Sequence, residues 1–223
     1  MRHATFGLTL TVTLALAAPL AAQQQPGPDG GPTEAQLALA ETEIPRLVEM
    51  FQLKPGMTVA DVGAGFGAWT IGFAEAVGPT GRVYSSDVGE QQLASLRGTM
   101  TRLGLTNVTV VEAGERSTNL PDACCDAILV RDVYHHLTAP EDITGSLAAA
   151  LKPGGRLVVV DFLPRPNTEV PAGVPANRGG HGVPTEVVIA EVTAAGLTHV
   201  ISDPQWSGTP QQPASLFLTL FRK

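Results

Sequence analysis

The stretch that decides the fold is Asp61-Val62-Gly63-Ala64-Gly65-Phe66-Gly67. It follows a short apolar run at residues 58–62, which predicts a buried strand, and it leads into a helical pattern over residues 66–77. Glycines at a strand-to-helix turn let the backbone approach a ligand, and the helix N-terminus offers free amides to an anion. Taken alone, the loop is ambiguous, because Gly63-x-Gly65-x-x-Ala68 also satisfies the loose dinucleotide-binding pattern.

Two acids beside this loop narrow the choice of ligand. Asp87 ends the next predicted strand, 20 residues after Gly67, where a carboxylate can accept from both hydroxyls of a ribose. Asp61 stands next to the glycines, where its charge repels a pyrophosphate and attracts an ammonium or sulfonium group. The pair therefore predicts an adenosine-containing ligand that carries a positive charge; a tight turn with a solvated Asp87 is the alternative.

Outward from the loop, helices and strands alternate, which predicts a parallel sheet covered on both faces and closed by an antiparallel edge hairpin. Pro45 is expected to break the first helix, giving two short helices within 33–53. The loop at 163–184, rich in proline and glycine, is expected to form no regular element and to act on the substrate side. The predicted helices are 33–52, 66–77, 89–103, 139–151 and 185–195, and the predicted strands are 58–62, 82–86, 107–111, 126–130, 156–162, 197–202 and 216–221.

The composition excludes several classes of protein. With 223 residues, 43% of them hydrophobic and 16% charged, the chain can bury the core of one domain and is not disordered. A net charge of −7 argues against a nucleic-acid partner. Cys124 and Cys125 are adjacent, so they supply neither a disulfide framework nor metal-ligand spacing, and we interpret them as small buried hydrophobic residues. We expect no metal.

The N-terminal segment has the layout of a secretory signal peptide. Residues 1–22 combine a basic start, an apolar run too short for a transmembrane helix and small residues at a cleavage point near Ala22. We expect a flexible linker at 23–32, a single domain at 33–223 and export to the periplasm or medium. An uncleaved interfacial anchor or a wrongly assigned start, which would leave the protein cytoplasmic, is the alternative.

Two later segments complete a set of motifs. Asp126–Leu137 contains the fourth strand and its polar end, and Leu151–Leu157 is a helix-to-strand turn. With Val59–Gly67 and Asp87, in this order, they resemble the class I S-adenosylmethionine-dependent methyltransferases, especially small predicted bacterial members that carry an export signal. The resemblance covers roughly residues 44–223. It implies an α/β fold with a doubly wound, mostly parallel seven-stranded sheet, order 3-2-1-4-5-7-6, in which strand 7 is antiparallel.

The resemblance also implies S-adenosylmethionine as cosubstrate, a small-molecule methyl acceptor and a monomer or homodimer. At one position the chain departs from the family, because Glu115 stands where an Asp is commoner. The cosubstrate-binding residues implied by the resemblance are Asp61, Gly63, Ala64, Gly65, Gly67, Asp87, Val88, Glu115, Arg116, Arg131 and Asp132.

Candidate acceptor-side residues follow the fourth strand and lie in the proline- and glycine-rich loop. A neutral histidine can act as a general base near pH 7, so His135, His136 and His181 are candidates; caps of the strand end (His135, His136) or an exposed helix entry (His181) are the alternatives. Tyr134 is interpreted as packing or as a hydroxyl contact to substrate, because its pKa is near 10. Related sequences often have His-Arg at the position of His181, and Gly182 departs from that pattern.

Three functions from different classes remain open. The leading hypothesis is a methyltransferase acting on a small molecule by O-, N-, S- or C-methylation. The second is an exported, non-catalytic protein that binds an adenosyl ligand, and the third is a nicotinamide-dependent oxidoreductase, against which Asp61 and the turn at Lys152 argue. Trp69 is interpreted as core, and Trp206 as local packing in the hairpin loop, with a partner contact as the alternative.

Overall fold

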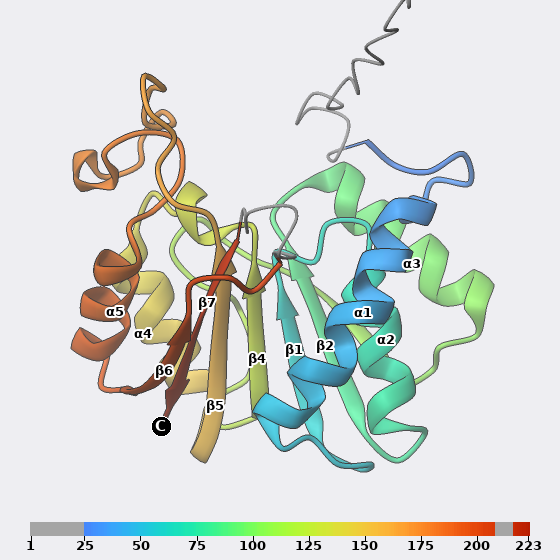
Figure 1. Ribbon diagram of the computed structural model, residues 1–223. Coiled ribbons are helices and arrows are strands. Elements are labelled where there is room, and N and C mark those ends of the chain that lie inside the picture. Colours follow the sequence, from blue (N-terminus) through green and yellow to red (C-terminus); the bar gives the residue numbers. More distant parts are fainter. Residues whose placement is uncertain (1–24, 208–215) are drawn as a thin grey trace, which may run out of the picture.

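The computed structural model describes residues 25–207 and 216–223 (Figure 1). In this part of the chain seven strands form one sheet of order β3-β2-β1-β4-β5-β7-β6, which confirms the predicted topology. β1 to β5 are parallel, and β7 is antiparallel to both of its neighbours. The strands are β1 (Thr58–Val62), β2 (Arg82–Asp87), β3 (Val108–Glu112), β4 (Cys125–Arg131), β5 (Leu151–Asp161), β6 (Thr198–Asp203) and β7 (Phe217–Arg222).

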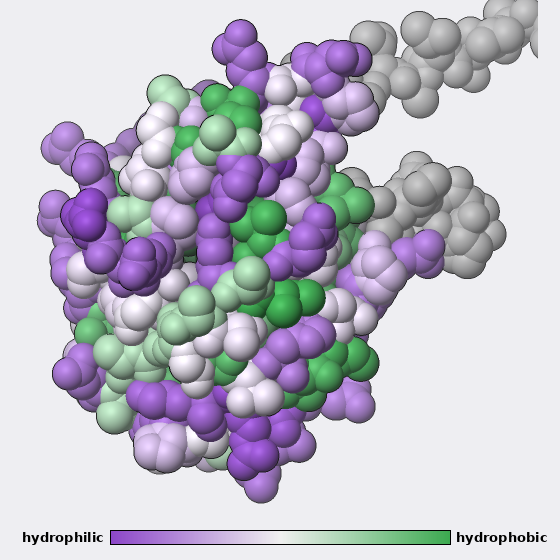
Figure 2. Space-filling view, turned by 90° about the vertical axis from the view of Figure 1, so that its left-hand side faces the viewer, coloured by the Kyte–Doolittle hydropathy of each residue, from purple (hydrophilic) through white to green (hydrophobic). Residues whose placement is uncertain are grey.

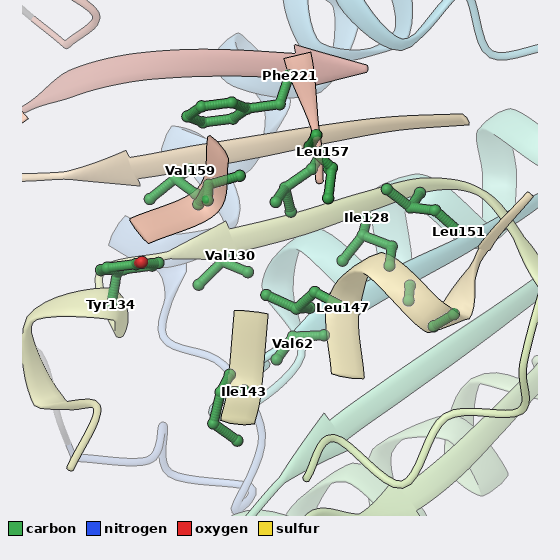
Figure 3. Packing of buried hydrophobic residues seen from close by; sticks show 14 of the residues in the cluster. Val62, Ile128, Val130, Tyr134, Ile143, Leu147, Leu151, Leu157, Val159 and Phe221 are labelled. Carbon is green, nitrogen blue, oxygen red and sulfur yellow. The ribbon is translucent and has the colours of Figure 1, made fainter. Parts of the chain in front are cut away.

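Helices cover both faces of the sheet because the central strands are apolar on both sides. Successive side chains of a strand point to opposite faces. Thus Ile128 and Val130 of β4 pack in the cluster formed with α4 and α5 (Figure 3), whereas Ala127 and Leu129 pack in the cluster formed with α1 and α2. The helices are α1 (Glu34–Phe51), α2 (Ala68–Val77), α3 (Glu90–Leu103), α4 (Pro140–Ala150) and α5 (Thr185–Ala194).

The first helix is continuous, so the predicted break at Pro45 is wrong. Pro45 lies inside α1 on its exposed side. The helix carbonyl that lacks a donor because proline has no N–H can therefore bond to water. The helix starts with a capping box, in which Thr33 Oγ1 accepts from Gln36 N at 3.2 Å and Gln36 Oε1 accepts from Thr33 N at 2.8 Å. Burial of Leu47 and Phe51 after the proline holds the second half in line with the first.

β5 begins earlier than predicted. Leu151 pairs with Cys125, and the register then shifts so that Ala127 pairs with Arg156. The segment expected to be a helix-to-strand turn is therefore an irregularity inside the strand. Lys152 Nζ in this segment donates to Asp126 Oδ2 at 2.8 Å, which holds the irregular part against the amino end of β4.

The two adjacent cysteines are joined by a disulfide, so they are not the unbridged, small hydrophobic residues expected from the sequence. Cys125 is fully buried, as predicted, and packs in the same cluster as Leu151. The bridge links neighbouring residues at the start of β4 and therefore closes no loop of the chain.

The loop at 163–184 contains a short 3-10 helix, Ala176–Arg178, where no regular element was expected. It is held by Arg178, which is fully buried and donates to both oxygens of Glu191 on α5 at 2.8 and 3.1 Å. A buried, bidentate ion pair fixes the base of this loop on the domain.

The N-terminal segment is described only from residue 25 onward, so the predicted signal peptide at 1–22 lies outside the described residues. The described part of the predicted linker lies against α3: Asp29 pairs with Arg102, and Gly30 O accepts from Ser95 Oγ. No helix within residues 25–207 and 216–223 is long and apolar enough to cross a membrane.

Candidate functional site

The carboxyl ends of β1, β2, β4 and β5 meet along one edge of the sheet, at the top of Figure 1. Two adjoining cavities of about 260 and 650 Å³ open there, and Gly63, Asp87, Val133 and His136 line both of them. An open α/β sheet binds ligands in the crevice outside the carboxyl ends of its strands. Residues that the sequence singled out therefore line two cavities at this edge of the sheet.

The glycine loop brings backbone to the wall of both cavities. Gly63 has a φ of 72°, and a Cβ atom there would collide with the side chain of Val133. Its N–H donates to Ser86 O at 2.8 Å, which ties the loop to the end of β2. Ala64 and Gly67 line the smaller cavity.

Asp87 is held rigidly between the two cavities. Its Oδ2 accepts from Gly65 N at 2.9 Å, and its Oδ1 accepts from Val88 N at 2.8 Å and from Gly89 N at 3.0 Å. Oδ1 thus accepts two hydrogen bonds, whereas Oδ2 accepts one and has a further acceptor site for a ligand hydroxyl. Val88 beside it is 65% exposed and lines the larger cavity, so an apolar surface is available next to the acid.

Asp61 is a buried acid without a cationic partner in direct contact among the described residues. It is 3% exposed, and Thr70 Oγ1 donates to it at 2.6 Å. The pKa of Asp61 is raised to about 6, mainly by burial and in addition by the charge of Asp87. The Thr70 hydrogen bond and the charge of Arg131 oppose this rise in pKa. A cationic ligand group placed here would stabilise the buried carboxylate in its charged form.

Arg131 belongs to a buried network that includes a residue the sequence analysis missed. Glu43 of α1 accepts from Arg131 Nε at 2.8 Å, from Arg131 Nη2 at 3.2 Å and from Trp69 Nε1 at 2.9 Å. The guanidinium carbon lies 3.9 Å from the centroid of the Trp69 ring. Trp69 is thus part of the wall of the smaller cavity as well as of the core. An acid on the apolar stripe of α1, between Ala40 and Leu47, is the sequence signal for Glu43.

His135 is fixed by a second missed acid, Asp161 at the end of β5. His135 Nδ1 lies 2.8 Å from Asp161 Oδ1, and His135 N donates to Asp161 Oδ2 at 3.0 Å. Both side chains are buried. Asp161 ends a buried apolar run in the same way as Asp87 ends β2, and that position is the signal that could have revealed it.

Asp132 follows β4 in a left-handed conformation, with φ 57°, and lines the smaller cavity. Burial raises the pKa of Asp132, and the nearby charge of Asp161 adds to this effect. A carboxyl group with a raised pKa facing a cavity can take up a proton at a pH closer to neutrality than an ordinary aspartate.

His136 and His181 come together with His135, although they belong to different segments of the chain. The ring centroid of His136 lies 4.0 Å from that of His135 and 5.6 Å from that of His181. Burial, together with the neighbouring His135 and His181, lowers the pKa of His136 to about 4. Burial also lowers the pKa of His181. Both imidazoles are therefore neutral near pH 7.

Four of the predicted residues line neither cavity: His135, His181, Tyr134 and Arg116. The rings of His135 and His181 lie beside that of His136, which lines both. Tyr134 is fully buried and donates to Glu191 Oε2 at 2.9 Å, and burial raises its pKa, so it packs rather than reacts. Arg116 is exposed and pairs with Asp142 on α4, whereas the preceding Glu115 lines the larger cavity. Trp206 is also buried, under the guanidinium of Arg46 at 3.6 Å from its ring centroid, in agreement with local packing.

Known proteins share this sequence and fold in part. Residues 59–155 match the methyltransferase domain family. The chain is 34% identical over 116 residues to the ubiquinone/menaquinone biosynthesis C-methyltransferases of Ectopseudomonas mendocina and Pseudomonas fluorescens, which is 52% of this chain and 45% of each relative. It therefore spans about half the length of the curated relatives it matches.

Solved structures cover more of the chain. A SAM-dependent methyltransferase from Aquifex aeolicus has a TM-score of 0.64 at 26% identity, covering 81% of this chain and 89% of that one. Phosphoethanolamine N-methyltransferase 2 from Haemonchus contortus, in complex with S-adenosylmethionine, has a TM-score of 0.64 at 13% identity and covers 82% and 52%. The domain match, the sheet order and these neighbours support a class I S-adenosylmethionine-dependent methyltransferase.

Proposed function

We propose that the protein binds S-adenosylmethionine across the two cavities and transfers its methyl group to a small-molecule acceptor. The observation that carries this proposal is Asp87, which stands at the junction of the cavities with its carboxylate fixed by three backbone donors. Oδ2 of this carboxylate would accept a hydrogen bond from a ribose hydroxyl of the cosubstrate. The adenine would lie against Val88 and Glu115 in the larger cavity.

The smaller cavity suits the methionine part. Its wall contains the buried acid Asp61 and the backbone of Gly63 to Gly65. The amino group of the methionine part would supply a positive charge in contact with Asp61. The glycine backbone leaves room for the carbon chain that leads to the sulfonium. Binding would thus bring the pKa of Asp61 back toward that of an ordinary aspartate.

The chemistry asked of the protein is positioning and removal of a proton. The sulfonium already makes the methyl group electrophilic, so the site must align the acceptor and exclude water. A pKa near 4 makes His136 a weak base at pH 7, which suits it to orient the acceptor by a hydrogen bond. Asp132, whose pKa is raised, is the better proton acceptor among the groups in the cavity wall.

The acceptor is proposed as a small molecule and no more. The curated relatives are named for C-methylation in ubiquinone and menaquinone biosynthesis, but the match spans about half of each chain. The net charge of −7 argues against a nucleic acid as the acceptor.

We also propose that the protein is exported, and the sequence of residues 1–22 supports this proposal. N-terminal sequencing of the protein from its native host tests it, and an intact Met1 would overturn it.

The binding proposal is tested by calorimetry of the full chain with S-adenosylmethionine and S-adenosylhomocysteine. Asp87→Ala should weaken binding by about 10- to 100-fold, because a charge-assisted hydrogen bond to a ribose hydroxyl contributes roughly 1.5–3 kcal/mol. Asp203→Ala is the matched control, because Asp203 also ends a strand, accepts from the backbone N–H two residues later and lies away from the cavities. Its binding should be unchanged.

The same titration separates the alternatives. Binding of NADH in place of S-adenosylmethionine would favour the oxidoreductase. Methyl transfer is measured with S-adenosylmethionine that carries a radiolabelled methyl group and a panel of small-molecule acceptors. Binding of S-adenosylmethionine without transfer to any of these acceptors would favour the non-catalytic ligand-binding protein. Equal weakening by Asp87→Ala and Asp203→Ala would remove the ribose assignment.

A further inference from the structure

Three histidines from two separate segments converge beside the cavities. His135 and His136 lie in the short 3-10 helix after β4, and His181 lies in the loop before α5. One potential ligand atom from each side chain lies within 4.8 Å of the other two. The rings are packed closely, with 5.1 Å between the centroids of His135 and His181. Such a cluster brings together the side chains most used to bind transition metals.

The first histidine is prepared as a ligand by a buried carboxylate. His135 Nδ1 lies 2.8 Å from Asp161 Oδ1, so the ring donates there and keeps its lone pair on Nε2. A carboxylate behind a ligating histidine fixes the tautomer and the ring orientation in many metal sites. Asp161 therefore has the position expected of the residue that supports a metal ligand.

The second observation is a polar atom that lacks a partner. His181 Nε2 is buried and has no hydrogen-bond partner among the described residues, which is costly for a ring nitrogen. The backbone holds this ring in place: His181 N donates to Thr168 Oγ1 at 2.8 Å. Gly182 has a φ of 130°, and a Cβ there would lie 2.7 Å from Leu163 O, so the departure from His-Arg has a steric reason.

The third histidine gives the cluster its open side. His136 is the most exposed of the three histidines and lines both cavities, so a cation held by the three rings would face the proposed reaction chamber. Three protein ligands with one open position are typical of zinc sites that take up a further group.

We propose that His135, His136 and His181 form a binding site for a divalent transition-metal ion, with Zn²⁺ the best match. Imidazole nitrogens suit zinc, copper, iron and nickel, whereas Mg²⁺ and Ca²⁺ take oxygen ligands. Tetrahedral zinc with nitrogens at about 2.0–2.1 Å places them about 3.4 Å apart, so the side chains draw together on binding. This site departs from the expectation of no metal.

The test is calorimetry with ZnCl₂ on the full, tag-free chain after removal of metal with EDTA and without reductant, so that the cysteines stay bridged. One ion should bind per chain. His136→Ala and His181→Ala should each weaken binding at least 100-fold, and Asp161→Asn should weaken it by about 10- to 100-fold. His199→Ala is the control, because His199 lies on β6 near Ser202, away from the cluster, and should leave the affinity unchanged.

Two further measurements keep the outcome clear. Circular dichroism and thermal unfolding show whether each variant is folded. S-adenosylmethionine binding is titrated separately on the wild-type chain, so a failure of the metal site is distinct from a failure of the proposed function. Co²⁺ bound to the wild-type chain should give the intense visible absorption of a four-coordinate site, whereas MgCl₂ should give no heat. Absence of Zn²⁺ binding, or undiminished binding by a folded His181→Ala variant, would overturn the proposal.

Discussion

The two ends of the parallel strands treat polar side chains in opposite ways. At the amino ends, Asp126 accepts from Thr58 N and from Lys152 Nζ, each at 2.8 Å. Asn107 Nδ2 donates to the carbonyls of Ala74 and Gly78, both at 2.9 Å. Opposite charges meet and the amide closes a helix end, so these groups stabilise the fold without any ligand.

At the carboxyl ends the pairing is incomplete. Asp61, Asp87, Asp132 and Asp161 gather there, and burial with like charge raises the pKa values of Asp61 and Asp132. Among the described residues, His181 Nε2 is buried without a partner. Sites that bind ligands often depart from the best local stability in this way. Unpaired charges and a buried polar atom without a partner among the described residues thus distinguish the end of the sheet that lines the cavities.

The largest expected effect comes from breaking the buried ion pair of Glu43 with Arg131 at the carboxyl ends. Glu43→Ala leaves the buried guanidinium of Arg131 without its carboxylate, which should lower the free energy of unfolding by about 3 kcal/mol. Urea denaturation measures this change. Glu49→Ala, an exposed glutamate on the same helix, is the control and should cost less than about 0.5 kcal/mol. Equal effects would show that the pair is not structurally important.

Asp61→Asn should act in the opposite direction and raise stability. The pKa of Asp61 is higher in the folded state, about 6, than the ordinary 3.8, so the folded state holds more protons between these values. The free energy of unfolding therefore falls as the pH rises from about 4 to 6 and stays lower above it. At pH 7 the asparagine variant should be more stable by up to about 3 kcal/mol, because it has no charge to bury.

The measurement is urea denaturation of both proteins at pH 4 and pH 7 without ligand. Their difference should shrink at the lower pH, where Asp61 is protonated in the folded state. Affinity for S-adenosylmethionine should fall at the same time, because the variant lacks the charge for the amino group. A variant less stable than the wild-type chain at pH 7 would contradict the comparison.

At the amino ends a substitution should change stability and leave binding alone. Asp126→Ala removes the acceptor for Thr58 N and the partner of the partly exposed Lys152, which should cost about 1 kcal/mol. Thermal unfolding measures the loss. Affinity for S-adenosylmethionine should stay within a factor of two, and a larger change would blur the division between the two ends.

The smallest effect is expected at Arg116. This side chain is 74% exposed and pairs with Asp142 rather than with the cavity wall. Arg116→Ala should shift stability by less than about 0.5 kcal/mol and affinity less than twofold, because exposed pairs contribute little. Calorimetry with S-adenosylmethionine measures the affinity, and tenfold weaker binding would restore the predicted contact.

Local patterns predicted the sheet well because its strands are apolar and short, and each is bounded by glycine, proline or an acid. The order of the sheet came from the resemblance to a family, since local patterns do not specify which strands pair. Pro45 was misjudged because its cost depends on which side of the helix faces solvent, and tertiary packing decides that.

The candidate site was predictable where one segment carries it and not where several segments meet. The glycine loop and Asp87 follow from the chain's own spacing. Glu43 and Asp161 act on residues 88 and 26 positions away, and only the fold brings these groups together. Cys124 and Cys125 were misread for a related reason, because their pairing depends on the local backbone path at the start of β4.

The place of β7 has a consequence for the order of events in folding. It lies between β5 and β6, both of which are synthesised before it. Until residues 217–222 leave the ribosome, β5 keeps an open hydrogen-bonding edge and β6 has no strand to join. The sheet is therefore completed only when its last strand along the chain pairs with β5 and β6, two strands that cannot pair with each other without it.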